Sequence, residues 1–563
     1  MFHLLVTLAT LAHCALSRDV SSPSVLDPLS TFASGAWSLV QQGTSGVSGM
    51  QLAIVTETTA VIFDKVEHNP LMTEDGNPAW TAELNLNTHV VRPLHALSNT
   101  WCATGSFLGN GTLLSSGGNP IVITGQDGLQ SLRFFTPCQD GTCDIWENSS
   151  VVRTTSPRWY PGSVRIEDGS VIIFGGATAN GWMNNATANN PSYEFYPPKN
   201  INGFKGLKIP SPFLASTLNA NLFPIVMELP DGNLFVAANQ EAMIFNWKTN
   251  TETPLPGIPN GVRVSYPLSG SAVLLPLTPE NNYMPEVMIC GGTTILDTAD
   301  PSTLSSQFPA SAQCSRLLLT AEGIAAGWKV EHMPQARVMP DMTGFGAYAN
   351  APDALGPISN ADHPAFTPVV YDPTGAAGRR FCSQGIPAST IPRLYHSTAT
   401  LTPNGSILLA GSNPNVDITI GTEYQTEYRP VMNARWNVVL EFYSPAYLSK
   451  PRPSYKGLPA TVNYNSKFTL SVQLPPDTTG VTAALMDLGF ATHGVHMDQR
   501  FVKLVSKLSS DKKTLTVTGP PTSRIYPPGP AFLYVVPLAG FPASGTRLLS
   551  GRGHPHRLIR GYR

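Results

Sequence analysis

The stretch SPRWYPGSVRIEDGSVIIFGGA (156–177) contains a short polar lead, an apolar strand, an Asp-Gly turn and a second apolar strand that ends in glycines. Similar phrases are SNTWCATGSFLGNGTLLSSGGN (98–119) and PRLYHSTATLTPNGSILLAGS (392–412), and weaker copies lie at 229–240 and 284–292. Asn-Gly and Asp-Gly favour type I′ turns, whose twist suits a β-hairpin. The chain therefore repeats one hairpin unit.

The spacing of these units predicts a β-propeller. The turns at 110, 168 and 231 are about 60 residues apart, which suits four strands with inserted loops. In a propeller, such sheets surround a central axis. The copies, with one further sheet around 51–65, give six or seven blades. From Trp436 onward the phrase stops, and the strand spacing predicts an immunoglobulin-like β-sandwich over 436–546.

Composition agrees with an all-β fold. The chain has 563 residues, too many for one core, and its 48 glycines and 51 prolines supply many turns. A net charge of −2 gives no reason to expect a nucleic-acid partner. The basic cluster RGHPHRLIRGYR (552–563) lies in a segment, 547–563, that we interpret as a solvated tail.

The first residues predict secretion. MFHLLVTLATLAHCALS (1–17) has the apolar run and the small residues of a signal peptide, although a buried first strand is the alternative interpretation. No later stretch is apolar for long enough to predict a membrane span. An extracellular glycoprotein also fits the four acceptor sequons, which begin at Asn110, Asn148, Asn185 and Asn404.

Without the signal segment, six cysteines remain for an oxidising compartment. Spacing predicts two disulfides, Cys138 with Cys143 and Cys290 with Cys314. Cys102 and Cys382 either bridge each other or leave one thiol for another purpose.

Register brings several reactive groups to equivalent positions. Counting eight residues back from the turns at 110, 168 and 404 reaches Cys102, Tyr160 and His396, and Tyr395 immediately precedes the last. Equivalent positions in propeller blades lie at one height around the axis. Each of these residues alone is most often a packing residue. Together, a thiol, two phenols and an imidazole are expected to converge on one point.

Such a set indicates copper. Phenol oxygen and imidazole nitrogen suit tetragonal Cu(II) better than they suit zinc. A second imidazole is expected from ATHGVHMDQR (491–500), a segment of the sandwich that could fold back over the axis. There, His493 and His496 are alternative ligands.

Seven phrases of the chain are distinctive in combination: WCATG (101–105), RWYPG (158–162), ARVMPD (336–341), RLYHS (393–397), ATHGVHMDQR (491–500), NADHPAFTPVVYDP (360–373) and VEHNPLMTEDGNPAW (66–80). They resemble phrases of the copper radical oxidases, and most of all those of the fungal glyoxal oxidases. The resemblance implies a seven-bladed kelch-like β-propeller over 18–435, followed by the immunoglobulin-like sandwich. One departure is that 342–366 contains no recognisable hairpin, which would leave one blade incomplete.

The resemblance also implies a site. Cys102 and Tyr160 would be joined by a thioether, and Tyr160 would bind copper as the radical residue. Tyr395 would be the axial phenol and the proton acceptor. His396 and His493 would be the imidazole ligands, with His493 preferred to His496 because it follows the threonine of a T-H-x-V phrase.

Two further residues are assigned by the same resemblance. Arg337 would orient the substrate, and Trp182 would shield the radical. Under the thioether assignment, Cys382 is left as an odd thiol.

The implied activity is a secreted, monomeric oxidase. It would oxidise small aldehydes such as glyoxal and methylglyoxal, as hydrates, to carboxylic acids, and it would reduce dioxygen to hydrogen peroxide, which extracellular peroxidases would consume. Two alternatives remain open. One is a primary-alcohol oxidase of the galactose oxidase kind with the same site, and the other is a non-catalytic propeller that binds a glycan or a protein.

Overall fold

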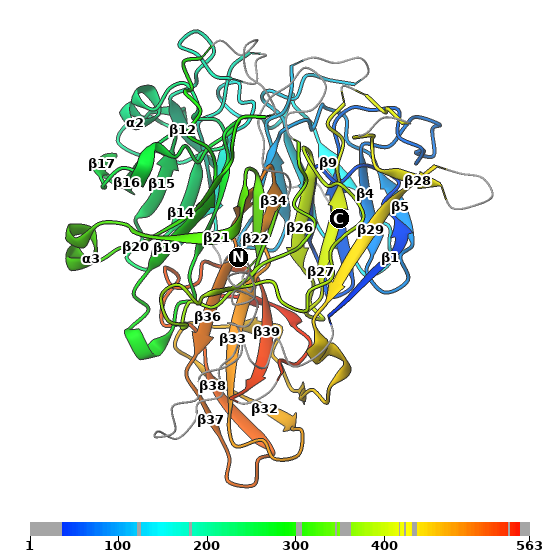
Figure 1. The fold of residues 1–563 in the computed structure, drawn as a ribbon, viewed down its shortest axis with the longest axis vertical. Helices are drawn as coiled ribbons and strands as arrows, with labels where there is room; N and C mark the ends of the chain where they lie inside the picture. Colours follow the sequence, from blue (N-terminus) through cyan, green and yellow to red (C-terminus); the bar gives the residue numbers. More distant parts are fainter. Residues whose placement is uncertain are drawn as a thin grey trace, which may run out of the picture.

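The computed structural model describes residues 37–120, 125–179, 183–299, 307–343, 346–349, 362–415, 417–420, 424–430, 436–538 and 541–551. The predicted signal segment, Trp182 and residues 552–563 of the basic tail lie outside the described residues. Almost all of the regular secondary structure in the described chain is β-strand (Figure 1). Its helices are the short α2 (Pro212–Ser216) and α3 (Ala321–Ala326) and the 3₁₀ turns Pro259–Gly261, Pro279–Asn281 and Ala446–Ser449. None of the described helices has the length and hydropathy that a membrane crossing requires.

Four antiparallel sheets of four strands follow one another along the chain, and each pairs its strands in sequence order. The first contains β6 (Thr104–Phe107), β7 (Leu113–Ser116), β8 (Leu132–Phe135) and β9 (Ile145–Glu147). The second contains β10 (Gly162–Arg165), β11 (Val171–Phe174), β12 (Ser192–Tyr196) and β13 (Ile209–Pro210). The third contains β14 (Ile225–Glu228), β15 (Leu234–Ala238), β16 (Glu241–Asn246) and β17 (Thr251–Pro254). The fourth contains β18 (Gly270–Leu274), β19 (Glu286–Gly291), β20 (Ser311–Leu318) and β21 (Lys329–Arg337).

The hairpins that open the repeated units share one turn. The glycine after the Asn or Asp has a φ of +82° to +97° and donates its N–H to the carbonyl three residues earlier; these are Gly111, Gly169, Gly232 and Gly405. The Asn or Asp side chain accepts the N–H two residues later at 2.8–3.0 Å. Only the glycine has a positive φ. Three-residue loops of this kind are type I turns followed by a left-handed glycine, so the expected type I′ turns are corrected.

The earliest described strand completes a sheet that is formed mostly by much later residues. β1 (Ser38–Thr44) pairs with β29 (Trp436–Ser444), which in turn pairs with β27 (Ile407–Gly411) and thereby joins β26 (Ser397–Leu401). Sequence analysis placed the segment of β29 in the sandwich. Its pairing instead places it in this sheet, because it carries the partners of both β1 and β27, and the sandwich strands begin only at Ser454. The short strand β28 (Tyr428–Pro430) also pairs with β29.

A hairpin from the C-terminal region joins the sheet nearest the N-terminus. That sheet contains β2 (Gln51–Ile54), β3 (Thr59–Phe63), β4 (Thr81–Asn85) and β5 (Val91–Leu94). β34 (Phe490–Thr492) pairs with β2, and β35 (Val495–Met497) pairs with β34. β35 also lies against the first strands β10, β14 and β18 of three other sheets. In Figure 1, β34 therefore stands in the middle of the surrounding sheets, above the orange and red strands of the C-terminal region.

The segment that was expected to lack a hairpin forms a short one. β22 (Pro340–Thr343) pairs with β23 (Gly346–Ala349), and β24 (Val370–Tyr371) pairs with β25 (Phe381–Cys382). β22 lies between β18 and β26, which are the first strands of the neighbouring sheets. The strands β22 to β25 therefore fill the position between the sheets that begin with β18 and β26, even though these strands are short.

The C-terminal region contains two sheets. One contains β30 (Ser454–Lys456), β32 (Lys467–Gln473), β38 (Thr514–Thr518) and β37 (Ser506–Leu508). The other contains β31 (Thr461–Val462), β40 (Thr546–Ser550), β39 (Gly529–Pro537), β33 (Val481–Asp487) and β36 (Arg500–Leu504). The first residues of the segment expected to be a solvated tail, 547–550, are therefore part of a strand in which Leu548 and Ser550 are buried. One buried apolar cluster runs from β18, at Leu274, into these sheets at Leu485 and Val502. This continuous core holds the C-terminal region against the four-stranded sheets.

Both predicted disulfides are confirmed. Cys138 is bonded to Cys143, and Cys290 on β19 is bonded to Cys314, its direct partner on β20. Cys102 is a buried thiol that forms no disulfide with Cys382.

Candidate metal centre

The candidate residues lie where the chain enters the first strands of different sheets. Cys102 precedes β6, Tyr160 precedes β10, and Tyr395 and His396 precede β26. His493 lies in the turn between β34 and β35. Because these first strands surround the β34–β35 hairpin, the side chains meet at one end of it.

The backbone has the same conformation at the positions that counting back from the hairpin turns predicts to be equivalent. The residues eight positions before the four turns are Cys102, Tyr160, Phe223 and His396, and all four have a positive φ, between +44° and +63°. This conformation is uncommon for residues other than glycine and is found at functional sites, where the surrounding structure enforces it. His493 has it as well, with φ +49°. The repeated backbone conformation therefore turns these side chains toward one place.

The side chains form one buried cluster. Cys102 Sγ lies 3.3 Å from His493 Nε2, and the donor atoms of Cys102, His396 and His493 all lie within 4.8 Å of one another. The hydroxyl oxygens of Tyr160 and Tyr395 are 3.3 Å apart. None of the five residues is more than 6% exposed. Water is therefore largely excluded from the donor atoms.

Hydrogen bonds fix how both imidazoles face the cluster. The Thr492 hydroxyl donates to the Met50 carbonyl at 3.0 Å, so toward His493 Nδ1, 2.7 Å away, it can only accept. His493 therefore carries its proton on Nδ1. His396 Nδ1 lies 2.9 Å from the Asn413 carbonyl, which also only accepts. In each ring, the lone pair is left on Nε2.

Burial sets the protonation states of the cluster. Burial lowers the pKa of His493 to about 3. Burial, together with the nearby imidazole of His493, also lowers the pKa of His396 well below its usual range. Burial raises the pKa values of the Cys102 thiol and the Tyr160 and Tyr395 phenols well above their usual ranges. At neutral pH the imidazoles are neutral, whereas the phenols and the thiol keep their protons unless a cation replaces them.

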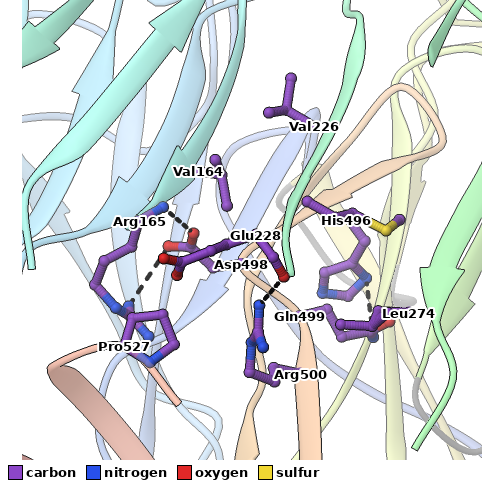
Figure 2. Close-up of a pocket in the computed structure, with 11 residues that line it drawn as sticks. Val164, Arg165, Val226, Glu228, Leu274, His496, Asp498, Gln499, Arg500 and Pro527 are labelled. Carbon is purple, nitrogen blue, oxygen red and sulfur yellow. Dashed lines mark hydrogen bonds and ion pairs between the residues drawn. The ribbon is translucent and has the colours of Figure 1, made fainter. Parts of the chain in front are cut away.

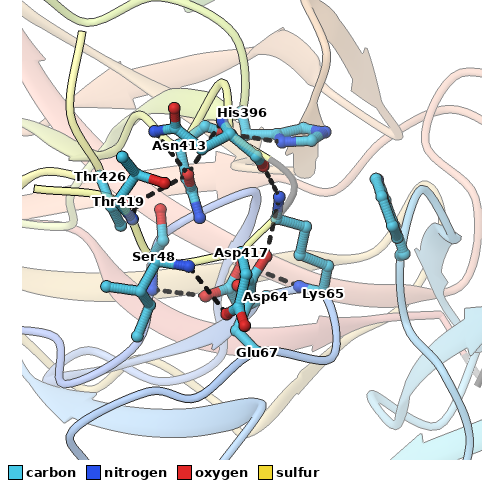
Figure 3. A network of polar contacts seen from close by, with 12 residues as sticks. Ser48, Asp64, Lys65, Glu67, His396, Asn413, Asp417, Thr419 and Thr426 are labelled. Carbon is cyan, nitrogen blue, oxygen red and sulfur yellow. Dashed lines mark hydrogen bonds and ion pairs between the residues drawn. The ribbon is translucent and has the colours of Figure 1, made fainter. Parts of the chain in front are cut away.

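A polar network supports His396 from behind (Figure 3). The Asn413 side-chain oxygen accepts from the Thr426 hydroxyl at 2.9 Å and from the Asn415 N–H at 3.1 Å. Lys65, whose side chain is fully buried, donates to the Asn415 carbonyl and forms a 2.7 Å ion pair with Glu67. The loop that presents the Asn413 carbonyl to His396 is thus held by a buried ammonium group. Contacts of this kind, made to the far side of a metal-binding imidazole, fix the orientation of its ring.

His496 lies apart from the cluster. Its Nε2 donates to the Leu488 carbonyl at 2.7 Å, and its ring lines a separate pocket with the charged side chains Arg165, Glu228 and Asp498 (Figure 2). The structure therefore brings His493, and not His496, to Cys102.

Sequence analysis missed one member of the cluster, Tyr266. Its hydroxyl lies 2.5 Å from that of Tyr395 and 3.2 Å from that of Tyr160, and its ring stacks on Tyr160 with centroids 4.4 Å apart. A signal was present: RVSYPLSG (263–270) repeats the arginine-then-aromatic lead of the other units. Its hairpin lacks an Asn-Gly or Asp-Gly turn, so counting back from the turn could not reach it.

Arg337 is buried at the end of β21, where its Nη2 donates to the Thr367 carbonyl at 2.8 Å. Arg158 and Arg393, which precede Tyr160 and Tyr395, each form a buried 2.7 Å ion pair with a glutamate and so have structural contacts. The substrate-orienting role of Arg337 remains a prediction. The shielding role of Trp182 concerns a residue outside the described chain.

The donor set fits copper. His396 Nε2 is buried and has no hydrogen-bond partner among the described residues, as expected for a lone pair that faces a metal position. His493 Nε2 lies 3.3 Å from the Cys102 sulfur in the same buried cluster, to which Tyr160 and Tyr395 contribute phenol oxygens. Nitrogen and oxygen donors of this kind suit Cu(II). A closed structural zinc site would instead be expected to contain four cysteine or histidine ligands.

Comparisons with known proteins show which family the chain belongs to. Residues 52–447 match the family model for the glyoxal oxidase N-terminus, and residues 452–548 match the galactose oxidase-like early set domain. The chain is 33% identical over 540 residues to the aldehyde oxidase GLOX of Vitis pseudoreticulata, and the match covers 90% of this chain and 95% of that protein. It is 30% identical over 493 residues to the aldehyde oxidase GLOX1 of Arabidopsis thaliana, which covers 83% of this chain and 74% of that protein.

Among solved structures, the chain is similar to a fungal alcohol oxidase of the AA5 family in complex with copper. The TM-score is 0.68 at 17% identity, and the match covers 92% of this chain and 99% of that one. At this level of identity the likeness concerns the fold: an all-β chain with an early set domain.

Proposed function

Because the chain belongs to the copper radical oxidase family, we propose that it oxidises small aldehydes such as glyoxal and methylglyoxal, as hydrates, to carboxylic acids. The two-electron acceptor in this proposal is dioxygen, which becomes hydrogen peroxide. The balance is one aldehyde hydrate and one dioxygen to one carboxylic acid and one hydrogen peroxide. No further reductant or oxidant is needed.

The observation that carries the proposal is the buried cluster of five donor side chains. Two imidazoles that each carry a lone pair on Nε2 lie with a thiol and two phenols in a site that excludes water. We assign Tyr160, Tyr395, His396 and His493 as the copper ligands. When bound, copper supplies a one-electron acceptor and makes a hydroxyl at the site more acidic.

Tyr160 supplies the second electron acceptor in this proposal. Oxidation of an aldehyde hydrate removes two electrons, and a single Cu(II) accepts one. A thioether between Cys102 and Tyr160 would spread the unpaired spin over sulfur. Forming it makes one C–S bond and removes the thiol hydrogen and one ring hydrogen, with dioxygen as the oxidant. The two residues are adjacent, because the Tyr160 N–H donates to the Cys102 carbonyl at 3.2 Å.

Tyr395 is assigned as the proton acceptor. Its phenol oxygen lies 3.3 Å from that of Tyr160, so a substrate hydroxyl at the metal position would be within its reach. Arg337 is proposed to orient the substrate, and Trp182 to shield the radical.

The remaining features of the proposal concern architecture and location. We assign the sheets that run from β1 to β29 as a seven-bladed kelch-like propeller, in which β22 to β25 form the incomplete blade, and the strands from β30 onward as an immunoglobulin-like sandwich. We propose secretion after removal of 1–17, which two disulfides and four exposed sequon asparagines support. A monomer that passes its peroxide to extracellular peroxidases completes the proposal.

Recombinant protein loaded with copper provides the test. Peroxide release is measured with methylglyoxal, glyoxal and galactose, alongside a His396→Ala protein as the matched control that lacks one ligand. We expect peroxide from the two aldehydes and none from the control. Release from galactose alone would assign an alcohol oxidase, and copper-loaded protein that releases none from any substrate would assign a binding protein.

Peptide mapping tests the cofactor separately. After copper loading in air, the peptides that contain Cys102 and Tyr160 should be linked and lighter by two hydrogens than their sum. A Cys102→Ala protein should yield the Tyr160 peptide alone. An unmodified Cys102 in active wild-type protein would remove the thioether from the mechanism.

A further inference from the structure

We propose that Tyr266 is a positioning residue of this site, which holds the Tyr395 phenol through its hydroxyl and the Tyr160 ring through stacking. The inference rests on the proposed function and deepens it. Tyr266 contacts both of the tyrosines to which roles are assigned, and nothing in the assigned ligand set requires it.

The backbone places Tyr266 rigidly. Its N–H donates to the Leu222 carbonyl at 2.9 Å, and its side chain is fully buried. Three residues earlier, Arg263 forms a 3.0 Å ion pair with Asp297 and exchanges backbone hydrogen bonds with Thr293. The segment that carries Tyr266 is thus fixed on both sides, as a positioning residue requires.

The hydroxyl contacts define the first part of the role. The three phenol oxygens form a triangle with sides of 2.5 Å to Tyr395, 3.2 Å to Tyr160 and 3.3 Å between those two. A phenol has one O–H to donate. Because the Tyr160 hydroxyl donates to that of Tyr266, the O–H of Tyr266 is available to donate to Tyr395. The contact fixes where the Tyr395 oxygen lies relative to the metal position and to a substrate hydroxyl.

The ring contacts define the second part. Tyr266 and Tyr160 stack with centroids 4.4 Å apart and an interplanar angle of 18°. A second neighbour, Phe223, meets Tyr160 edge-on at 85°. One planar ring therefore covers a face of Tyr160 and restricts its rotation. Sequence analysis assigned such a covering role to Trp182, whereas Tyr266 is the stacked ring among the described residues.

Two substitutions separate the parts. Tyr266→Phe keeps the stacked ring and removes the hydroxyl, whereas Tyr266→Leu removes both. Tyr193 offers a matched control, because it is also a buried tyrosine that donates a hydrogen bond, to Asn250, but it lies in β12 away from the cluster. All proteins are loaded with copper and compared with wild type by copper content, by peptide mapping and by melting temperature.

The readouts go beyond activity. In Tyr266→Phe we expect full copper content and a normal Cys102–Tyr160 link. We also expect a changed Cu(II) electron paramagnetic resonance spectrum and a kcat about 10-fold lower at unchanged KM, the size of one lost hydrogen bond to a catalytic group. In Tyr266→Leu we expect the Tyr160 radical to decay several-fold faster as well. Tyr193→Phe should match wild type in all of these.

The outcomes are decisive. A Tyr266→Phe protein with wild-type spectrum and kcat overturns the hydroxyl part, and a Tyr266→Leu protein with wild-type radical lifetime overturns the stacking part. If wild type binds no copper and forms no thioether, the proposed function fails and this inference with it. If wild type is active and both Tyr266 variants behave like it in every readout, the proposed function stands and this inference alone fails.

Discussion

Replacing Thr492 by valine should weaken copper binding without unfolding the protein. The Thr492 hydroxyl is the acceptor that keeps the proton of His493 on Nδ1, because its own hydrogen is donated to the Met50 carbonyl. Valine has the same shape and no acceptor. In the metal-free variant, the imidazole can move its proton to Nε2, toward the sulfur of Cys102 at 3.3 Å. In the copper-bound variant Nε2 would bind the metal, so the proton could not move there and would stay on Nδ1.

The magnitude follows from this difference between the two states. In the copper-bound variant, a buried Nδ1–H has no acceptor, which costs about 1–3 kcal/mol. The metal-free variant avoids this cost. The donor lost by the Met50 carbonyl affects both states and cancels. At about 1.4 kcal/mol per factor of ten, the dissociation constant of copper should rise about 5- to 150-fold, in line with the 10- to 100-fold typical of second-shell substitutions.

The assay is a competition titration of copper between the protein and a chelator at fixed pH. Thr492→Ser is the matched control, since it keeps the hydroxyl and should stay within about threefold of wild type. Melting of the metal-free proteins checks that the valine protein folds. A folded Thr492→Val protein with the copper affinity of wild type would refute the argument that this hydroxyl fixes the imidazole.

Three further outcomes are expected. Tyr395→Phe should keep copper and the thioether while kcat falls about 10²- to 10⁴-fold, because it deletes the proton acceptor; near-normal peroxide release at full copper content would return Tyr395 to a packing role. His493→Ala should abolish copper binding, whereas His496→Ala should retain it, because His496 is bonded to the Leu488 carbonyl in a separate pocket; copper analysis showing the reverse would contradict the site. In the metal-free protein, burial lowers the pKa of His493 from 6.5 to about 3, so between these pH values the unfolded chain binds one proton more than the folded chain. As the pH falls through this range, the free energy of unfolding should fall by up to about 1.4 kcal/mol per pH unit. Urea unfolding at several pH values should show a shallower pH dependence for His493→Gln, and an equal dependence would disprove this contribution.

Much of the fold was predictable because a recognisable turn sequence recurs in most of the repeated hairpins. The Asn-Gly and Asp-Gly turns mark each hairpin, and counting back from them identified positions that the backbone makes equivalent, including Cys102 and His396. The type of turn was not predictable from the dipeptide. Loop length decides between a type I′ turn and a type I turn with a left-handed glycine, and loop length depends on where strand pairing stops.

The position of the domain boundary and the presence of Tyr266 in the cluster could not be predicted from the sequence, for a related reason. β29 is an apolar strand whose own pattern fits either domain, and only its pairing with β1 and β27 assigns it to a sheet. Tyr266 lies in a unit without the marking turn, so its neighbours could not be counted. Both facts depend on contacts between residues far apart in sequence, which local patterns do not encode.

The pairing of β1 with β29 has a consequence for how the chain is synthesised. Gln41 and Glu441, which pair in these strands, are 400 positions apart. At about 5–20 residues per second, the first strand leaves the ribosome on the order of 20–80 s before its partner. During that time its edge is open to other chains, a recognised route to aggregation. His493 is made later still, so a nascent chain holds the phenols and the thiol of the cluster well before its second imidazole. With the ligands proposed above, copper would find all of them only after synthesis of the chain is nearly finished, so its binding would belong to maturation and not to the growth of the chain.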